Sequence, residues 1–341
     1  MANKAAWLSS KHAHPLNIDS SPMPDAGEKL ITIRVHATAI NPVDSAIQTL
    51  GLIVEEYPAI LGCDAAGEVT AVGSKVTSFK VGDRVTGSCD HAEDLLGKGT
   101  FQLYCNLRPE LTGKISDNVE YKDACVLPLG INTACFGLFE KTTLALPFPQ
   151  AEPKDIGKTV LIWGGSSSVG SCAIQAAKAA GCKVAATASA HNLEYCKGIG
   201  ADWAFDHKSE GIVEDVVEAL TGCDFAGAFN CIMAPDTYIK CAEIVHQLGG
   251  NQMVESILPE PMPWDRNLPH GVKWGHNNSS YIKYSDVGPA IYQKWLPEAL
   301  ANGTLKCKPD AVVVGKGLEY CQEACDRVKS ASAQKFVVVV Q

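Results

Sequence analysis

Two patterns of hydrophobic and polar residues divide the chain, and the change between them lies near Ala124. Before that point, short stretches such as Leu30 to Ile40 alternate apolar and polar residues, which is typical of half-buried strands. Glycines separate these stretches, as turns between strands require. After that point, strand patterns alternate with helical ones as far as about residue 252, which predicts a parallel sheet with right-handed crossovers. The expected fold is therefore α/β, with a small β-rich domain beside the parallel sheet.

The second stretch predicts individual strands and the helices that connect them. The strands are expected at residues 159–163, 183–187, 203–206, 225–231 and 250–254, and the helices at 169–180, 212–220 and 237–246. A Pro-rich loop, Leu258 to Gly271, follows, and then a helix at 287–301. The last segment predicts a strand, a helix and a very apolar strand, and we expect that final strand to complete the sheet of the first domain.

Composition narrows the class of protein. The chain has 341 residues, 46% hydrophobic and 20% charged, which is enough for two globular domains. A net charge of -9 without a basic run argues against nucleic acid as a partner. We expect no membrane segment and no secretory signal, because no apolar run approaches the required length. The 14 cysteines lack the spacing of a disulfide framework, so we expect reduced thiols in a cytoplasmic protein.

The segment TVLIWGGSSSVGSCAIQAAKAAG, which starts at Thr159, places a Gly/Ser loop between an apolar strand and an Ala-rich helix. Gly165, Ser167 and Gly170 have the spacing of a G-x-G-x-x-G dinucleotide fingerprint, with serine in the second place. In that fingerprint the first position makes a tight turn, the second lets backbone approach a pyrophosphate, and the third lets helix pack on strand. Such a loop can also be a plain turn, but the strands and helices around it favour a phosphate loop.

The end of the second strand indicates which nucleotide the loop serves. NAD sites place an Asp or Glu there, where it bonds the ribose 2′-hydroxyl. This chain has no acid from Lys183 to Leu193, and Ser189, His191 and Asn192 offer the hydrogen-bond donors that a 2′-phosphate needs. We therefore expect NADPH, although the same residues also suit the cap of a helix that begins near Asn192.

Several segments resemble the medium-chain dehydrogenase/reductase superfamily, over nearly the whole chain. They are ATAINPVD (37–44), YPAILGCDAAGEVTAVG (57–73), VLPLGINTACFGLF (126–139), GGSSSVGS (164–171) and GADWAFDH (200–207). They are similar to the zinc-free quinone oxidoreductase branch and to fungal trans-acting enoyl reductases, which work beside polyketide synthases. The resemblance implies a GroES-like β-rich catalytic domain, residues 1–125 and 273–341. It also implies a Rossmann NADP(H)-binding domain with a doubly wound parallel sheet, residues 126–272.

The resemblance also lets the zinc site be checked position by position. Zinc-dependent members carry a cysteine ligand where this chain has Asn41, and His-Glu where it has Cys63-Asp64. Their third ligand falls on Leu129, which cannot bind zinc, while asparagine does so rarely. A tetrahedral site needs three protein ligands. The cysteine quartet of the structural zinc lobe is also missing, so we expect no metal.

Hydride transfer without a Lewis acid suits a substrate that delocalises the incoming charge itself, such as an enone, a quinone or an enoyl thioester. The leading hypothesis is an NADPH-dependent reductase of an activated C=C bond, in secondary metabolism beside a polyketide synthase. Two alternatives stay open: a zinc-independent alcohol or carbonyl oxidoreductase, and a non-catalytic NADPH-binding partner protein. Some enoyl reductases carry a tyrosine acid where this chain has Leu52 and Ile53, so the catalytic proton donor is left unassigned.

By the same resemblance, cofactor-binding residues are expected in both domains. Asn41 and Thr133 would lie near the nicotinamide ribose and ring, and Val254 would border the nicotinamide. The phosphates would be held by Gly165, Ser166, Ser167, Ser168 and Val169 at the pyrophosphate and by Ser189, His191, Asn192 and His207 at the 2′-phosphate. Local roles also account for Asn41, as a turn former before Pro42, and for Thr133, as a helix cap.

Overall fold

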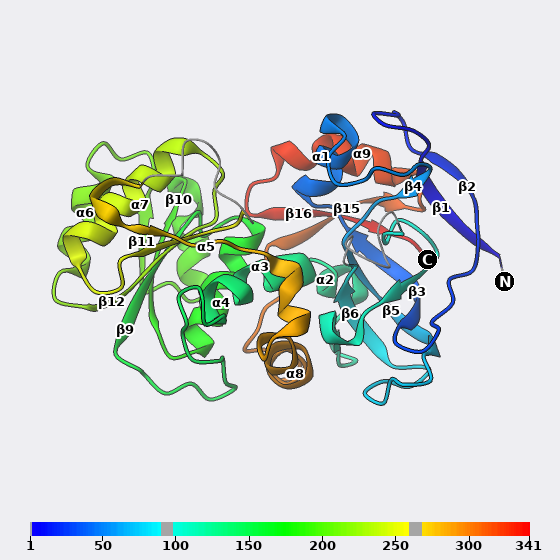
Figure 1. Cartoon of the computed structure of the whole chain (residues 1–341), viewed down its shortest axis with the longest axis horizontal. Helices are drawn as coiled ribbons and strands as arrows, with labels where there is room; N and C mark the ends of the chain where they lie inside the picture. Colours follow the sequence, from blue (N-terminus) through cyan, green and yellow to red (C-terminus); the bar gives the residue numbers. More distant parts are fainter. Residues whose placement is uncertain (1, 90–97, 259–267) are drawn as a thin grey trace. The chain divides into compact units, whose positions relative to one another are not determined.

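The computed structural model describes residues 2–89, 98–258 and 268–341 (Figure 1). Its backbone forms two compact units, one of residues Met1–Leu129 with Leu296–Gln341 and the other of residues Gly130–Trp295. This division differs from the expected domains in two stretches. Residues 126–129 belong to the first unit rather than the second, and residues 273–295 belong to the second unit rather than the first. The expected combination of a β-rich domain and a parallel-sheet domain is confirmed.

A mixed sheet forms the framework of the first unit, in the strand order β15-β16-β3-β5-β6-β8, with β7 also paired to β3. Its strands are β3 (Ile31–Ala39), β5 (Asp64–Val72), β6 (Arg84–Ser88), β7 (Tyr104–Leu107), β8 (Thr112–Lys114), β15 (Asp310–Lys316) and β16 (Gln334–Val339). A smaller sheet contains β1 (Asn3–Leu8), β2 (Asn17–Ser21) and β4 (Ala59–Ile60). As expected, the chain's last strand returns to this unit, where β16 pairs antiparallel with β3.

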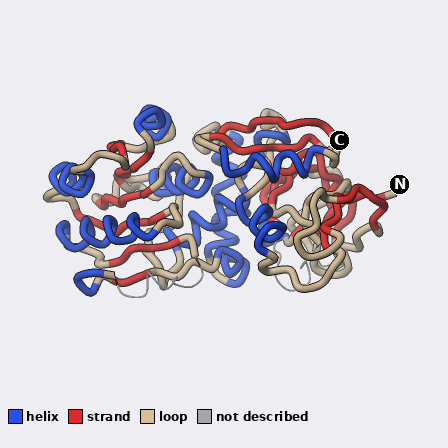
Figure 2. Tube along the Cα trace, turned by 90° about the horizontal axis from the view of Figure 1, so that it is seen from above, coloured by secondary structure: helices blue, strands red, loops and turns tan. Residues whose placement is uncertain are grey.

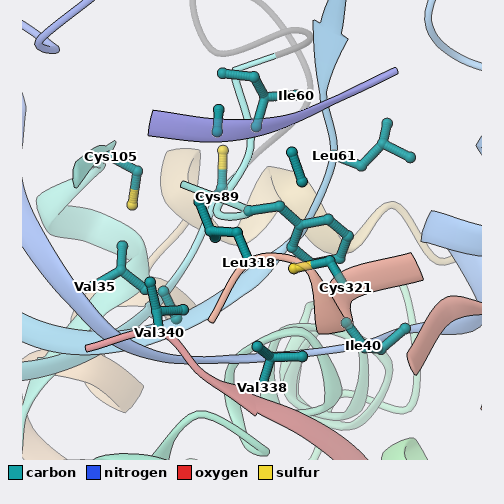
Figure 3. Close-up of a cluster of buried hydrophobic side chains, with 14 of the residues drawn as sticks. Val35, Ile40, Ile60, Leu61, Cys89, Cys105, Leu318, Cys321, Val338 and Val340 are labelled. Atoms are coloured by element: carbon teal, nitrogen blue, oxygen red, sulfur yellow. The ribbon is translucent and has the colours of Figure 1, made fainter. Parts of the chain in front are cut away.

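The helices of the first unit are short. They are α1 (Pro42–Leu50), α2 (Tyr121–Ala124), α8 (Leu296–Ala301) and α9 (Tyr320–Arg327). The core gathers apolar side chains from both ends of the sequence, as Figure 3 shows for Val35, Cys105, Leu318 and Val338. Burying a side chain such as Val35 contributes about 1.5–3 kcal/mol, so the two distant segments hold each other in place.

The second unit is a parallel sheet in the order β11-β10-β9-β12-β13-β14. Its strands are β9 (Lys158–Trp163), β10 (Lys183–Ala188), β11 (Trp203–Asp206), β12 (Asp224–Asn230), β13 (Met253–Ser256) and β14 (Lys273–Trp274). This is the order of a doubly wound dinucleotide fold. The hydrophobic pattern did not predict β14, because a strand of two residues leaves no alternation to read.

Helices connect these strands, and Figure 2 separates helices from strands along the trace. They are α3 (Pro128–Phe139), α4 (Ser168–Ala179), α5 (Leu193–Gly198), α6 (Ile212–Leu220) and α7 (Pro235–Leu248). The single helix predicted at 287–301 is a π-type turn, Pro289–Trp295, followed by α8. Within the described residues, no helix is both long and apolar enough to cross a membrane.

The strand order reverses beside β9, the first strand of the second unit along the chain. Ligands of open α/β sheets bind at the carboxyl ends of strands at such a point, because the connections there leave in opposite directions. The segment that follows β9 is the predicted phosphate loop. The fold therefore places that loop where a nucleotide site is expected.

Candidate functional site

The loop that follows β9 is fixed to the neighbouring strand β10. Gly164 has a φ of 85°, so the tight turn expected at Gly165 is made one residue earlier. The Gly164 N–H donates to Thr187 Oγ1 at 3.1 Å, and the Gly165 N–H donates to the Thr187 carbonyl at 2.8 Å. Thr187 was missed in the sequence because a threonine inside a strand has an ordinary structural explanation.

Glycine at positions 165 and 170 lets the loop, α4 and the sheet pack closely. A Cβ on Gly170 would overlap the Gly164 carbonyl oxygen, and a Cβ on Gly165 would lie 2.9–3.2 Å from side chains of α4, β10 and α5. Ser167 caps α4, because its Oγ accepts the Gly170 N–H at 3.0 Å. The third position of the fingerprint thus has the packing role that its spacing predicted.

Residues Ser166 to Val169 form the cradle at the start of α4, a helix of 12 residues. All four are half-buried rather than covered, so they stay accessible to a ligand. The first turn of a helix carries backbone N–H groups without intrahelical partners and a partial positive charge. Together with three serine hydroxyls, this cradle fits a pyrophosphate.

The structure brings together most of the residues predicted at the 2′-phosphate. Ser189 Oγ lies 3.3 Å from His207 Nε2, beyond the carboxyl ends of β10 and β11. The Asn192 amide donates to Ser166 Oγ at 3.4 Å, which connects this group to the phosphate loop. The His191 side chain is exposed. Two hydroxyls, an amide and an imidazole therefore lie at the edge of the sheet where the adenosine end of a dinucleotide binds.

One carboxylate near this group was missed in the sequence. Asp206 ends β11 and pairs in register with Ala188, the last residue of β10. Its Oδ1 accepts the Lys208 N–H at 3.1 Å. Looking for an acidic residue only at the end of β10 does not find Asp206, because Asp206 belongs to the neighbouring strand β11. Asp206 can weaken the binding of a 2′-phosphate by charge repulsion.

The two residues predicted at the nicotinamide in the second unit lie on different elements. Val254 is buried on β13. Thr133 lies in the middle of α3, so its alternative role as a helix cap is wrong. Its carbonyl accepts the Asn277 amide at 2.9 Å. Asn277 could not be selected from the sequence, because it follows no recognisable motif.

In the first unit, Asn41, the other residue predicted near the nicotinamide, is hydrogen-bonded to a buried carboxylate. Asp64, fully buried, accepts the Asn41 amide at 2.9 Å, the Leu129 N–H at 2.7 Å and the Lys335 ammonium at 2.6 Å. Lys335 is itself only 3% exposed and also donates to the Val126 carbonyl at 3.0 Å. Asn41 directly precedes α1, so its local role beside Pro42 is real, but its amide nitrogen is bound to Asp64. Lys335 was missed because it stands at the start of an apolar strand.

Two further acidic groups surround this carboxylate. Asp44 accepts the Asn41 N–H at 2.8 Å and the Gly62 N–H at 3.1 Å. Burial, and next the charge of Asp64, raises the pKa of Asp44 to about 7 against the hydrogen bonds that lower it. Burial also raises the pKa of the Cys63 thiol well above its usual value, and the nearby Asp44 adds to this. Cys63 is therefore a neutral thiol.

These residues do not fit a zinc ion at the position that the resemblance indicates. The Asn41 amide is bound to Asp64, the Cys63 thiol keeps its proton, and Leu129 has no donor atom in its side chain. A zinc ligand set needs three deprotonated or neutral donors around one point. Elsewhere too, the described part of the chain has no group of three or more His, Cys, Asp and Glu placed to hold a metal.

Two family models match the chain. The alcohol dehydrogenase GroES-like domain matches residues 27–117, within the first unit. The model of zinc-binding dehydrogenases matches residues 168–263, within the second unit. The first matched segment contains Asn41 and Asp64, and the second begins at Ser168, in the cradle at the start of α4.

Individual proteins match over the whole length. A trans-enoyl reductase of Aspergillus japonicus is 39% identical over 346 residues, which cover 100% of this chain and 98% of that protein. A dehydrogenase of Aspergillus niger is 40% identical over 347 residues, with 99% of each chain covered. Among solved structures, the CurK enoyl reductase has a TM-score of 0.76 at 20% identity, with 99% of each chain covered. At that identity the structural likeness shows a shared fold.

The buried Asp64–Lys335 pair predicts a large stability loss when one partner is removed. Lys335→Met leaves the Asp64 carboxylate buried without its cation, which costs about 3–5 kcal/mol in the free energy of unfolding. The double variant Asp64→Asn/Lys335→Met should recover part of that loss. The exposed pair Lys75–Glu28 in the same unit provides the control, and Lys75→Met should change stability little. Urea unfolding measures all three, and equal effects of the two lysine substitutions would contradict the assignment.

The contact at Gly170 predicts a second loss. Gly170→Ala must push the loop away from α4, because the new Cβ meets backbone atoms that cannot rotate aside. We expect a lower Tm and a smaller rise in Tm on adding nucleotide. Gly198→Ala, at a helical glycine of the same unit with nothing within 4 Å of the new atom, should be neutral or stabilising. Thermal unfolding with and without nucleotide distinguishes the two, and a neutral Gly170→Ala would refute the packing argument.

Proposed function

Because the chain belongs to the medium-chain dehydrogenase/reductase superfamily, we propose that it is an NADPH-dependent, zinc-independent reductase of an activated C=C bond. The superfamily consists of oxidoreductases that bind a nicotinamide cofactor, and the chain is one of them. The finer parts of the proposal concern the nucleotide, the absence of zinc and the kind of substrate. Each rests on particular side chains.

The Lys335 ammonium beside Asp64 is the observation that carries the proposal. A catalytic zinc ion has an open coordination position at which it polarises a carbonyl. Here the cation is an ammonium group that donates to Asp64 and to the Val126 carbonyl, and its side chain is 3% exposed. A substrate therefore has to stabilise the charge of an added hydride by itself. Conjugated enones, enoyl thioesters and quinones do this by moving the charge onto oxygen.

The residues of the second unit support the rest of the proposal. When bound, NADPH supplies the hydride. Ser166 to Val169 hold its pyrophosphate, and Ser189, Asn192 and His207 bind its 2′-phosphate through hydroxyl, amide and imidazole groups. By resemblance, Asn41, Thr133 and Val254 serve the nicotinamide ribose and ring. No side chain is assigned as the acid, and water protonates the enolate that hydride addition leaves.

We also propose a polyketide synthase as the protein that presents the substrate, on the resemblance to trans-acting enoyl reductases alone. The relative in Aspergillus japonicus carries the name trans-enoyl reductase, which supports this choice. A cytoplasmic location belongs to the same proposal. It is supported by the 14 cysteines, none of which forms a disulfide, as is usual in a reducing compartment.

A substrate panel with chelator-treated protein tests the function. We expect NADPH-dependent reduction of a simple enone or a crotonyl thioester at an unchanged rate after chelation. Oxidation of simple alcohols with NADP and no enone reduction would instead indicate the alcohol or carbonyl oxidoreductase. Tight NADPH binding without turnover on any substrate would indicate the non-catalytic alternative. Loss of activity together with one bound zinc per chain would overturn the metal-free site.

Nucleotide preference tests the 2′-phosphate site. One hydrogen bond to a charged group contributes about 1.5–3 kcal/mol, so we expect kcat/KM to favour NADPH over NADH by at least roughly tenfold. The nearby Asp206 and the lack of a lysine among the assigned donors limit the preference. Ser189→Asp places a carboxylate against the 2′-phosphate and should reverse it.

Two further variants serve as controls for that measurement. Ser189→Ala removes the hydroxyl without adding charge, so it should weaken the preference without reversing it. Asp206→Asn removes a nearby negative charge and should raise the preference. If the wild type shows no preference, or if Ser189→Asp leaves the ratio where it was, the 2′-phosphate lies elsewhere.

A further inference from the structure

The most unusual polar group in the second unit is a buried carboxyl that none of the steps above uses. Glu255 lies on β13, next to Val254 and in register with Phe229 of β12, and it is 0% exposed. Neither of its carboxyl oxygens has a hydrogen-bond partner among the described residues. The side-chain oxygen of Asn277, also buried, has none either. Three acceptor oxygens in one buried region therefore lack a hydrogen bond of ordinary geometry.

Two glycines make room for this carboxyl. A Cβ on Gly275, in the segment after β14, would overlap Glu255 Oε2. A Cβ on Gly137 of α3 would lie 3.0 Å from Glu255 Cγ and 3.1 Å from the Asn277 amide nitrogen. The same point beneath Gly137 is thus approached by both side chains. The carboxyl is enclosed by three elements of the second unit, which are β13, α3 and the segment 275–277.

Such an environment strongly disfavours a charge. A buried polar group without partners costs free energy, and an isolated buried carboxylate costs far more. Burial raises the pKa of Glu255 to about 9, against the Ser256 N–H and the Asn277 amide, which lower it. The Cys231 thiol, after β12, is also influenced by Glu255, and burial raises its pKa well above the usual value, so it is neutral. A proton on Glu255 removes the buried charge and turns one of its two oxygens into a hydrogen-bond donor.

Asn277 connects this carboxyl to the residue proposed at the nicotinamide. Its amide donates to the Thr133 carbonyl at 2.9 Å, and its own N–H donates to the Leu258 carbonyl at 2.8 Å. Its side-chain oxygen has no hydrogen-bond partner, and its amide nitrogen interacts with the Glu255 carboxyl. A protonated carboxyl beside an amide can donate to the amide oxygen while it accepts from the amide nitrogen. In that arrangement the orientation of the Asn277 amide, and with it the hydrogen bond to Thr133, depends on the proton of Glu255.

We propose that Glu255 acts as a neutral carboxylic acid that fixes Asn277 and, through it, the Thr133 carbonyl of α3, and so is a positioning residue for the nicotinamide pocket. The positioning role rests on the proposed function, because the placement of the nicotinamide near Thr133 comes from that proposal. The neutral state of Glu255 concerns the folded protein alone.

The stability of the protein against pH tests the neutral acid without any cofactor. The folded-state pKa of Glu255, about 9, lies above the usual value of 4.5. Its contribution to stability is therefore complete below pH 4.5 and is lost progressively as the pH rises toward 9. Glu255→Gln has the same shape, carries a donor and does not ionise. The difference in Tm between Glu255→Gln and the wild type should therefore grow by several degrees in favour of the variant from pH 5 to pH 9.

Nucleotide binding tests the positioning role. We expect the wild type to bind NADPH roughly tenfold more weakly at pH 10 than at pH 7, the size of one lost hydrogen bond. Glu255→Gln should match the wild type at pH 7 and keep its affinity at pH 10, whereas Glu255→Leu should bind weakly at both. Binding of 2′,5′-ADP, which lacks the nicotinamide, should not change. Cys231→Ala should keep the wild-type pH dependence, since the neighbouring thiol is not the titrating group.

The two measurements separate the possible failures. Parallel Tm profiles of the wild type and Glu255→Gln would overturn the neutral acid. The Tm profiles could instead diverge as expected while Glu255→Gln loses as much NADPH affinity at pH 10 as the wild type. That result, or an equal loss of affinity for 2′,5′-ADP, would overturn the positioning role. If NADPH does not bind at all, the proposed function fails, and the pH dependence of Tm still decides whether Glu255 is protonated.

Discussion

The first unit depends on one buried carboxylate and the three donors that surround it. Asp64 binds a segment before α1 through Asn41, the start of α3 through Leu129, and the last strand through Lys335. A buried ion pair is tolerated only when its geometry is good and its remaining hydrogen-bonding capacity is filled, and both conditions hold here. Lys335 lies 271 residues after Asp64 in the sequence. The first unit therefore cannot complete its centre until the sequence of the second unit has been made.

Three acids are buried in the described part of the chain, and their environments differ. Asp64 lies beside an ammonium group, Asp44 has a pKa raised to about 7, and Glu255 has a pKa raised to about 9. The difference follows from the donors that reach each group, since burial is common to all of them. Around the phosphate loop, by contrast, the groups assigned to the cofactor are hydroxyls, an amide and an imidazole. This arrangement suits a ligand that brings its own negative charge.

The repeating parts of the fold could be predicted, and the unique contacts could not. Period and spacing located β9, α4 and the glycines of the phosphate loop, because each reflects a local rule of strand, helix or turn. The turn itself fell one residue early, at Gly164, since two adjacent glycines satisfy the same spacing. Lys335, Asp206 and Asn277 were missed because their importance comes from neighbours in space rather than in sequence. Glu255 had no signal, because a single acid at the end of a short strand usually faces solvent.

In the proposed reaction the substrate, and not a metal, carries the charge of the transferred hydride. The carbon that receives the hydride distinguishes the two cases. With deuterium at C4 of NADPH and a conjugated enone as substrate, we expect deuterium on the carbon remote from the carbonyl, in a saturated ketone. Mass spectrometry or NMR of the product locates the label. Deuterium on the carbonyl carbon, in an unsaturated alcohol, would show that the carbonyl is reduced and that the proposed reaction is wrong.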